Sequence, residues 1–226
     1  MIAEALAGRR IAVTGATGFL GTALIERLLR SVPECQVVAL IRPTLRVGAT
    51  ERLRRDVLRN DAFDRLRRQW GDDYDATVAR RLVALGGDVA ADGLGLSEEG
   101  RATLAGCDVV VHSAAAVAFD APYDTAVEVN LLGPSRVAAT LASLGNPAHL
   151  VAVSTAYVAG HRRGEAAEAP LSETPFSLDV GWRAEVDVAA RVRADTEAES
   201  RRSETLRRLT KAARGELGPA GTPLLA

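Results

Sequence analysis

Residues 10–21, RIAVTGATGFLG, carry an apolar strand-like run straight into a glycine-rich turn. Gly15 allows the chain to turn sharply, Gly18 allows the backbone to approach a ligand, and Gly21 allows the following helix to pack tightly on its strand. The N-terminus of that helix would present unpaired N–H groups and a positive dipole end. The stretch therefore predicts a site for the pyrophosphate of a dinucleotide.

The residues after the turn complete a strand–helix–strand unit. Leu24, Ile25, Leu28 and Leu29 recur at helical spacing, and a second apolar run follows at 37–41. A purely structural turn without a ligand is the alternative, and this context makes it the weaker interpretation.

The order of apolar runs along the chain indicates the fold class. They fall at 11–14, 37–41, 82–85, 109–112 and 150–154, with helix-like segments between them. This alternation predicts an α/β fold, a doubly wound parallel Rossmann sheet that binds NAD(P) and has helices on both faces. The stretch 50–81 mixes arginine with aspartate, which favours a solvated helical surface over a polyanion site.

The composition excludes several classes of function. The chain has 226 residues, a formal net charge of −1 and 47% apolar residues, which is typical of a soluble globular protein. We expect no nucleic-acid partner, because no basic field is present, and no transmembrane segment, because no apolar stretch is long enough. Cys35 and Cys107 each lie beside a predicted strand, so we expect buried thiols, no metal site and a cytoplasmic location.

The end of the second predicted strand bears on the choice of cofactor. An acid usually grips the ribose hydroxyls there, but this chain has Arg42. A guanidinium suits a 2′-phosphate, so NADPH is favoured over NADH, and a simple surface arginine is the alternative.

Two more segments would reach the same pocket from the ends of the third and fourth strands. Asp88 could accept from an adenine amino group or could stabilise a turn, and small residues after His112 would let the backbone approach the cofactor. We expect His112 itself to be packed rather than catalytic. The predicted cofactor-binding residues are Thr14, Gly15, Thr17, Gly18, Phe19, Leu20, Gly21, Arg42, Asp88, Val89, Ser113, Ala114 and Ala115.

Several motifs together resemble the extended short-chain dehydrogenase/reductases. They are TGATGFLG at 14–21, GDV at 87–89, HSAA at 112–115, VNLLG at 129–133 and VSTAYV at 153–158. With LGLS at 94–97, the chain is most similar to the fatty acyl-CoA reductases, and thioester reductase domains share most of these features. The resemblance implies an oxidoreductase of lipid metabolism that reduces a long-chain acyl-CoA or a carrier-linked acyl thioester with NADPH. A non-catalytic NADP-binding module is the contrasting possibility.

The resemblance also implies catalytic residues. Thr155 or Ser154 would hydrogen-bond the substrate carbonyl oxygen, and Asn130 would order a water in the proton relay. An ordinary polar residue on a helix at 121–144 is the weaker alternative for Asn130. The family's proton donor is a tyrosine followed four residues later by a lysine. This chain has no such pair, Tyr157 does not match its place, and we expect the pair beyond Ala226.

The C-terminal part of the sequence differs in character. We expect residues 1–165 to form the nucleotide-binding domain and residues 166–226 a charged helical extension, the incomplete start of a substrate-binding part. Residues 179–217 predict one long helix with a thin apolar stripe, followed by a breaker at 218–223. Such a helix needs a partner, either the remainder of the polypeptide or another chain.

Overall fold

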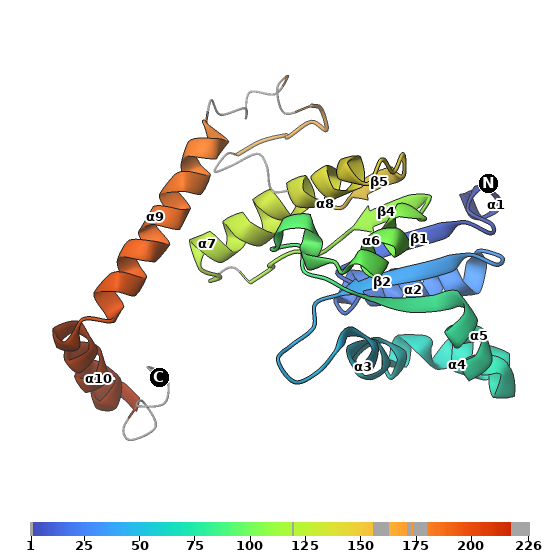
Figure 1. The fold of residues 1–226 in the computed structure, drawn as a ribbon, viewed down its shortest axis with the longest axis horizontal. Coiled ribbons are helices and arrows are strands. Elements are labelled where there is room, and N and C mark those ends of the chain that lie inside the picture. The colour runs from blue at the N-terminus through green and yellow to red at the C-terminus, as the bar shows by residue number, and fades with distance from the viewer. Residues whose placement is uncertain (1, 119, 156–162, 171–172, 174–179, 218–226) are drawn as a thin grey trace.

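The computed structural model describes residues 2–118, 120–155, 163–170, 173 and 180–217 (Figure 1). Within them, five parallel strands form one sheet in the order β3-β2-β1-β4-β5. The order reverses between β1 and β4, which leaves a crevice at their carboxyl ends, where this class of sheet binds ligands. The strands are β1 (Arg10–Thr14), β2 (Gln36–Ile41), β3 (Leu82–Gly86), β4 (Val109–His112) and β5 (His149–Ala152).

Helices connect the strands. The α-helices are α1 (Ile2–Ala5), α2 (Phe19–Ser31), α3 (Ala49–Arg52), α4 (Asp64–Trp70), α5 (Tyr74–Arg81), α6 (Glu98–Ala105), α7 (Tyr123–Ala126), α8 (Leu132–Ser143), α9 (Trp182–Ser200) and α10 (Ser203–Leu217). Two π-helical segments, η1 (Leu53–Leu58) and η5 (Val127–Leu131), and three 3₁₀ turns, η2 (Asp61–Phe63), η3 (Gly71–Asp73) and η4 (Asp92–Gly95), complete the described elements.

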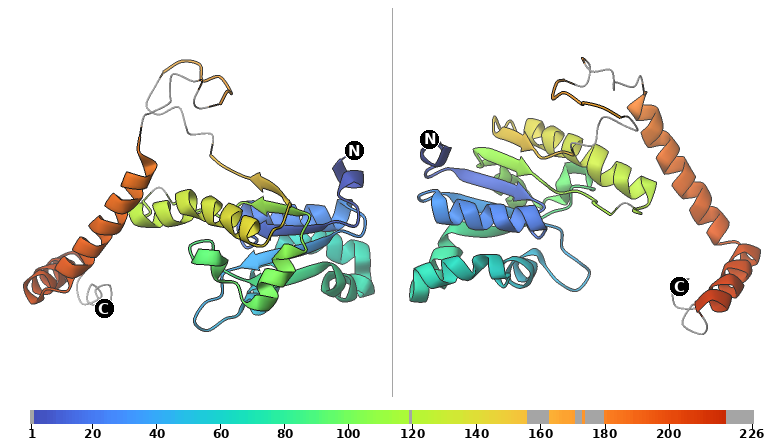
Figure 2. Two further views of the ribbon diagram at one scale, coloured as in Figure 1. Left: turned by 45° about the horizontal axis from the view of Figure 1, so that its top comes forward. Right: turned by 180° about the vertical axis from the view of Figure 1, so that it is seen from behind.

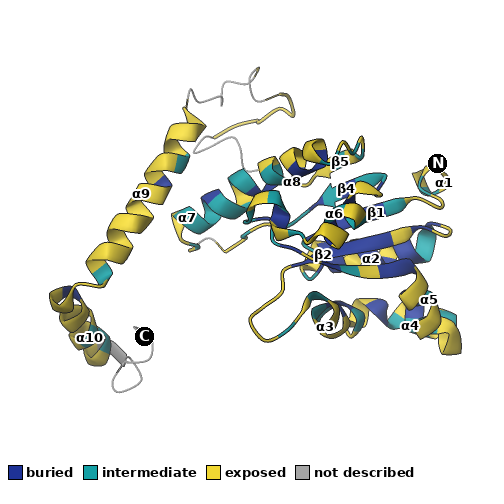
Figure 3. Ribbon diagram, viewed as in Figure 1, coloured by how far each residue is buried: buried dark blue, intermediate teal, exposed yellow. Residues whose placement is uncertain are grey.

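Each face of the sheet is covered by its own apolar cluster, because successive strand side chains point to opposite faces. Ile11 and Val13 of β1 pack with α2 and with the helical region 53–78. Ala12 of β1 packs on the other side with α6 and α8. Figure 3 shows the burial concentrated in the sheet and in α2. The doubly wound parallel fold predicted from the sequence is therefore confirmed.

Several predicted boundaries were wrong. The fifth strand ends at Ala152 instead of residue 154, because Ala152 already pairs with His112, the last residue of β4. The segment 121–144 is divided into α7, η5 and α8.

The predicted single helix at 179–217 was also wrong, since it is divided into α9 and α10. The break follows Ser200, where the N–H of Arg202 donates to the carbonyl oxygen of Glu199 (3.1 Å), three residues back, instead of continuing the four-residue spacing of an α-helix.

Helices α9 and α10 extend away from the sheet (Figure 2). Helix α9 meets the rest of the protein through α7, where the Tyr123 hydroxyl lies 3.3 Å from Glu185 and Arg193 pairs with Asp124 at 2.5 Å. None of the helices in the described part of the chain is long and apolar enough to cross a membrane.

Candidate nucleotide-binding site

A cleft of about 530 Å³ lies at the carboxyl ends of β1, β2 and β4. The glycine turn forms one wall, and the segments after β2, β3 and β4 form the others. Most of the predicted cofactor residues line it. The lining is Gly15, Ala16, Thr17, Gly18, Phe19, Leu20, Gly21, Leu40, Ile41, Arg42, Arg52, Gly87, Asp88, Val89, Ser113, Ala114, Ala115, Ala116, Val117, Thr125 and Val129.

The glycine turn has the geometry that its sequence requires. Gly15 has φ +70°, and a Cβ on it would lie 2.7 Å from the backbone of Ser113 and Ala114. A Cβ on Gly21 would collide with the carbonyl oxygen of Gly15. Both positions therefore exclude side chains, which leaves a cradle whose floor is backbone.

Helix α2 begins directly at this cradle. Its N-cap is Gly18, and no side chain caps its first turn. The N–H groups at that end therefore remain available to an anion in the cleft, together with the positive end of the helix dipole. Phe19 and Leu20 of the same turn line the cleft, and Phe19 is 97% exposed.

Thr14 does not line the cleft, contrary to what its place in the motif suggests. It is buried, and its hydroxyl oxygen accepts from the backbone N–H groups of Ser113 (3.2 Å) and Ala114 (3.1 Å). The hydroxyl also lies 2.8 Å from Nδ1 of His112. His112 is buried, as expected of a packed residue, and burial lowers its pKa.

Two arginines line one end of the cleft, where the segment after β2 forms its wall. The Arg42 side chain is 66% exposed, and its guanidinium is 4.0 Å from the Asp88 carboxylate. Arg52 of α3 donates to the Arg42 carbonyl oxygen (2.6 Å) and to Asp56 (3.0 Å). The sequence pattern does not point to Arg52, because the alternating charges around it are typical of a solvated surface.

Asp88 makes the predicted turn, and its contact with an adenine amino group stays a prediction. Its carboxylate accepts from the backbone N–H of Ala90 (2.9 Å), which is an Asx turn, and it also lines the cleft. Val89, next to it, is buried and packs against α8 at Gly133.

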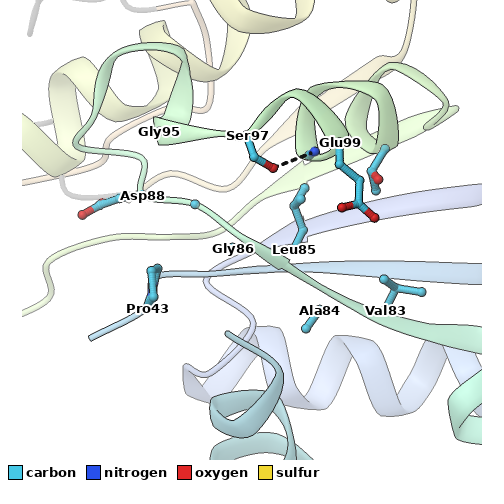
Figure 4. Close-up of a pocket in the computed structure, with 12 residues that line it drawn as sticks. Pro43, Val83, Ala84, Leu85, Gly86, Asp88, Gly95, Ser97 and Glu99 are labelled. Atoms are coloured by element: carbon cyan, nitrogen blue, oxygen red, sulfur yellow. Dashed lines mark hydrogen bonds between the residues drawn. The ribbon is translucent and has the colours of Figure 1, made fainter. Parts of the chain in front are cut away.

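A second hollow of about 470 Å³ lies between β3 and α6, and it shares Gly87 and Asp88 with the cleft (Figure 4). Its charged lining residues are Asp88 and Glu99, both acidic. In Figure 4 the Ser97 hydroxyl is bonded to a backbone nitrogen, that of Gly100, so it caps α6. A phosphate would meet like charge in this hollow, whereas the cleft offers arginines and a helix N-terminus.

The three predicted catalytic residues lie apart from the cleft lining. Ser154 and Thr155 follow β5 and are exposed. Asn130 is in η5, and its side-chain amide accepts from the N–H of Ala116 (2.8 Å) and donates to its carbonyl oxygen (2.9 Å). Asn130 therefore holds a backbone segment on the rim of the cleft. Tyr157 and the breaker at 218–223 fall outside the described residues.

Cys35 and Cys107 are free and buried, as expected, and burial raises the pKa of Cys107 to about 11. Among the described residues, no group of three or more His, Cys, Asp or Glu side chains could hold a metal ion.

Comparison with known proteins gives the family. A family model of an NAD-binding domain, described as "Male sterility protein", matches residues 13–214. Fatty acyl-CoA reductase 2, chloroplastic, of Arabidopsis thaliana is 32% identical over 169 residues, covering 74% of this chain and 27% of that protein. Fatty acyl-CoA reductase 1 of Rattus norvegicus is 32% identical over 164 residues, covering 72% of this chain and 31% of that protein.

Solved structures with the same fold include two reductase-type domains. The terminal R domain from the myxalamid PKS-NRPS biosynthetic pathway has a TM-score of 0.56 and 29% identity, covering 85% of this chain and 46% of that one. The reductase (R) domain of a nonribosomal peptide synthetase from Mycobacterium tuberculosis has a TM-score of 0.50 and 28% identity, covering 68% and 34%.

The sheet and its cleft define a Rossmann-type NAD(P)-binding domain. The chain belongs to the Male sterility protein family, whose model matches most of its length. This confirms the resemblance to fatty acyl-CoA reductases drawn from the motifs. The chain spans less than a third of the length of either of these two curated relatives.

Proposed function

We propose that this chain is the nucleotide-binding part of an NADPH-dependent reductase of long-chain acyl-CoA, acting in lipid metabolism. The observation that carries the proposal is the side-chain-free cradle at Gly15 and Gly21, which opens into a cleft with two arginines at one end. Two relatives named fatty acyl-CoA reductases support the substrate class.

The residues present fit a dinucleotide phosphate. The diphosphate would lie against the first turn of α2, and Arg42 with Arg52 would meet a 2′-phosphate on the adenosine ribose. Arg52 is 19% exposed and held by Asp56, so it is the preorganised member of the pair. Arg42 is freer and would move toward the phosphate from its long contact with Asp88.

The cofactor preference can be tested by exchanging charge at Arg42. Arg42→Asp should weaken the binding of NADPH by about tenfold or more, because it removes one charge-assisted bond to the 2′-phosphate. The affinity for NADH, which lacks that phosphate, should be nearly unchanged. Arg46→Asp is the matched control, since Arg46 is exposed but does not line the cleft. Calorimetric titration of both nucleotides measures the effect. Equal loss for the two cofactors would remove the argument from Arg42.

In the proposed reaction, the bound nicotinamide supplies a hydride to the thioester carbonyl, and the protein must stabilise the negative charge that develops on oxygen. Thr155 or Ser154 would donate a hydrogen bond to that oxygen. Asn130 keeps a lone pair and an N–H beyond those used on Ala116, and these would order a water of the proton relay. The sequence of 226 residues has no tyrosine followed four positions later by lysine.

We therefore expect the chain to bind NADPH without rapid turnover. An assay of NADPH oxidation with palmitoyl-CoA measures this. A rate near about 1 per second or above would show that the acid is supplied from within these residues.

A thioester carried on a carrier protein is the second candidate substrate. The fold similarity to the R domains named above favours it. Competition between acyl-CoA and acyl-pantetheine on a carrier protein, measured in the protein that contains the complete catalytic set, would separate the two.

We further propose that residues 166–226 begin a substrate-binding part, completed by the rest of a longer polypeptide or by a partner chain. Among the described residues, α9 contacts α7 and α10 and buries little of its length, which supports this. A reducing compartment such as the cytoplasm fits the free thiols of Cys35 and Cys107.

A further inference from the structure

The hydroxyl of Thr14 is the centre of a buried hydrogen-bond cluster. A hydroxyl has one proton to donate and two lone pairs to accept with. The N–H groups of Ser113 and Ala114 occupy both lone pairs, so the Thr14 proton points at Nδ1 of His112. His112 is therefore an acceptor at Nδ1, which makes it neutral with its proton on Nε2.

This cluster lies directly beneath the nucleotide cleft. Thr14 and His112 are partners in the last register position of β1 and β4, and Ser113 and Ala114 line the cleft. The Ser113 hydroxyl adds a bond to the Thr14 carbonyl oxygen (2.8 Å). Gly15 lies against the same two residues, with no room for a side chain. The cluster therefore sets the distance between the glycine cradle and the segment after β4.

No ionisable side chain faces His112 across either neighbouring strand at its register position. Its partners there are Thr14 of β1 and Ala152 of β5. On the covering layer, Asp92 and Glu128 are both paired with Arg136, and α6 carries Glu98, Glu99 and Arg101. Burial lowers the pKa of His112, and none of these charges contributes to the shift.

We propose that His112 is a positioning residue whose neutral form holds the floor of the nucleotide cleft, so that its protonation weakens nucleotide binding. The proposal rests on the proposed function only in naming the ligand as an NADP nucleotide.

The reason is a count of protons. A protonated His112 would donate from Nδ1 toward a Thr14 oxygen that already accepts two N–H groups. Three donors cannot share two lone pairs, so the N–H of Ser113 or Ala114 loses its acceptor. An unsatisfied buried donor destabilises this arrangement, and the two cleft-lining segments separate.

Titration of NADP⁺, which is stable in acid, tests the proposal in the whole chain. The readout is the ratio of the dissociation constants at about pH 5.5 and about pH 8. We expect the wild-type ratio to exceed that of His112→Asn by less than about tenfold, because burial lowers the pKa of His112 and leaves only part of it protonated at the lower pH. An asparagine Oδ1 takes the place of Nδ1 as an acceptor but does not titrate. Comparison between variants cancels the titration of the nucleotide's own phosphate.

The matched control is His149→Asn, because His149 is an exposed histidine of β5. It should keep the wild-type ratio, and a His112→Asn ratio equal to that of wild type would overturn the proposal. A second readout, ¹⁵N spectra of the wild-type imidazoles, requires neither a variant nor a nucleotide. A proton on Nδ1 of His112 at about pH 8 would overturn the proposal, whereas absence of NADP⁺ binding at both pH values would overturn only the proposed function.

Discussion

The sheet differs from the C-terminal helices, α9 and α10, in how far its apolar side chains are buried. Both regions have valine or leucine at regular spacing. Val38 of β2 is 0% exposed, whereas Val188 and Val192 of α9 are 41% and 56% exposed. Figure 3 shows α9 exposed over most of its length, with a buried band at Ala189. Periodicity predicts a helix or strand in either region, but tertiary stability requires a second layer to pack against.

The same contrast distinguishes the cofactor-binding residues from the proposed catalytic residues. The cofactor cleft is made from residues held by the buried sheet, so its geometry is fixed by packing. Ser154 and Thr155 follow the most exposed strand, β5, and are themselves exposed. We therefore expect substitutions in the glycine cradle to affect global stability and substitutions in α9 to affect only that helix.

The largest expected effect is that of Gly21→Ala. The added methyl would collide with the carbonyl oxygen of Gly15, so α2 must move off β1. We expect a loss of about 3 kcal/mol in the free energy of unfolding and a loss of nucleotide binding. Urea denaturation followed by circular dichroism measures the first, and titration with NADPH the second.

Gly48→Ala is the control for that change. Gly48 has φ −72°, and a Cβ there would meet nothing within 4 Å. Its denaturation midpoint should match the wild type within error. An unchanged midpoint for Gly21→Ala would show that helix and strand are not in the tight contact described.

A valine pair compares the sheet interior with its edge. Val38→Ala should cost about 2 kcal/mol, because it leaves a cavity between the sheet and the α6–α8 layer. Val151→Ala in β5 should cost less than about 0.5 kcal/mol, because Val151 is already 39% exposed. Equal losses in thermal or urea unfolding would mean that β5 is covered in solution.

Much of the sheet and of the cleft could be predicted from the sequence, for a physical reason. A strand buried on both faces reads as a continuous apolar run, and a glycine turn needs its glycines wherever it occurs. Gly15, Asp88 and Ala114 were therefore placed in the cleft by their position after strands. The positions of Thr14 and Arg52 depend on tertiary contacts and could not be predicted in this way. The Thr14 side chain is buried against His112, and the Arg52 side chain lines the cleft.

Local changes in the backbone hydrogen-bond pattern account for the wrong helix boundaries. The N–H of Arg202 donates to the carbonyl oxygen of Glu199, three residues back, and this tighter turn ends α9 within a stretch whose periodicity continues. The π-helical turn η5, which presents Asn130 to Ala116, leaves no signal in a spacing of 3.6 residues. Neither feature can be read from hydrophobic pattern alone.

The smallest expected effect is that of Arg193→Ala. Arg193 of α9 pairs with Asp124 of α7 at 2.5 Å and with Glu197 at 3.0 Å, and its side chain is 55% exposed. Exposed ion pairs contribute little, so we expect a loss below about 0.5 kcal/mol in global unfolding. Amide hydrogen exchange should nevertheless become faster across 182–200, while amides of β1 and β2 keep their rates.

Arg191→Ala, on the same helix but outside these pairs, should leave the exchange of α9 at the wild-type rate. If Arg193→Ala slowed exchange in α9, or if it lowered global stability as much as Val38→Ala, α9 would be part of the cooperative core. The division drawn between the sheet and the C-terminal helices would then be wrong, because a helix that meets the rest of the described protein through a few contacts with α7 is not expected to share the unfolding free energy of the sheet.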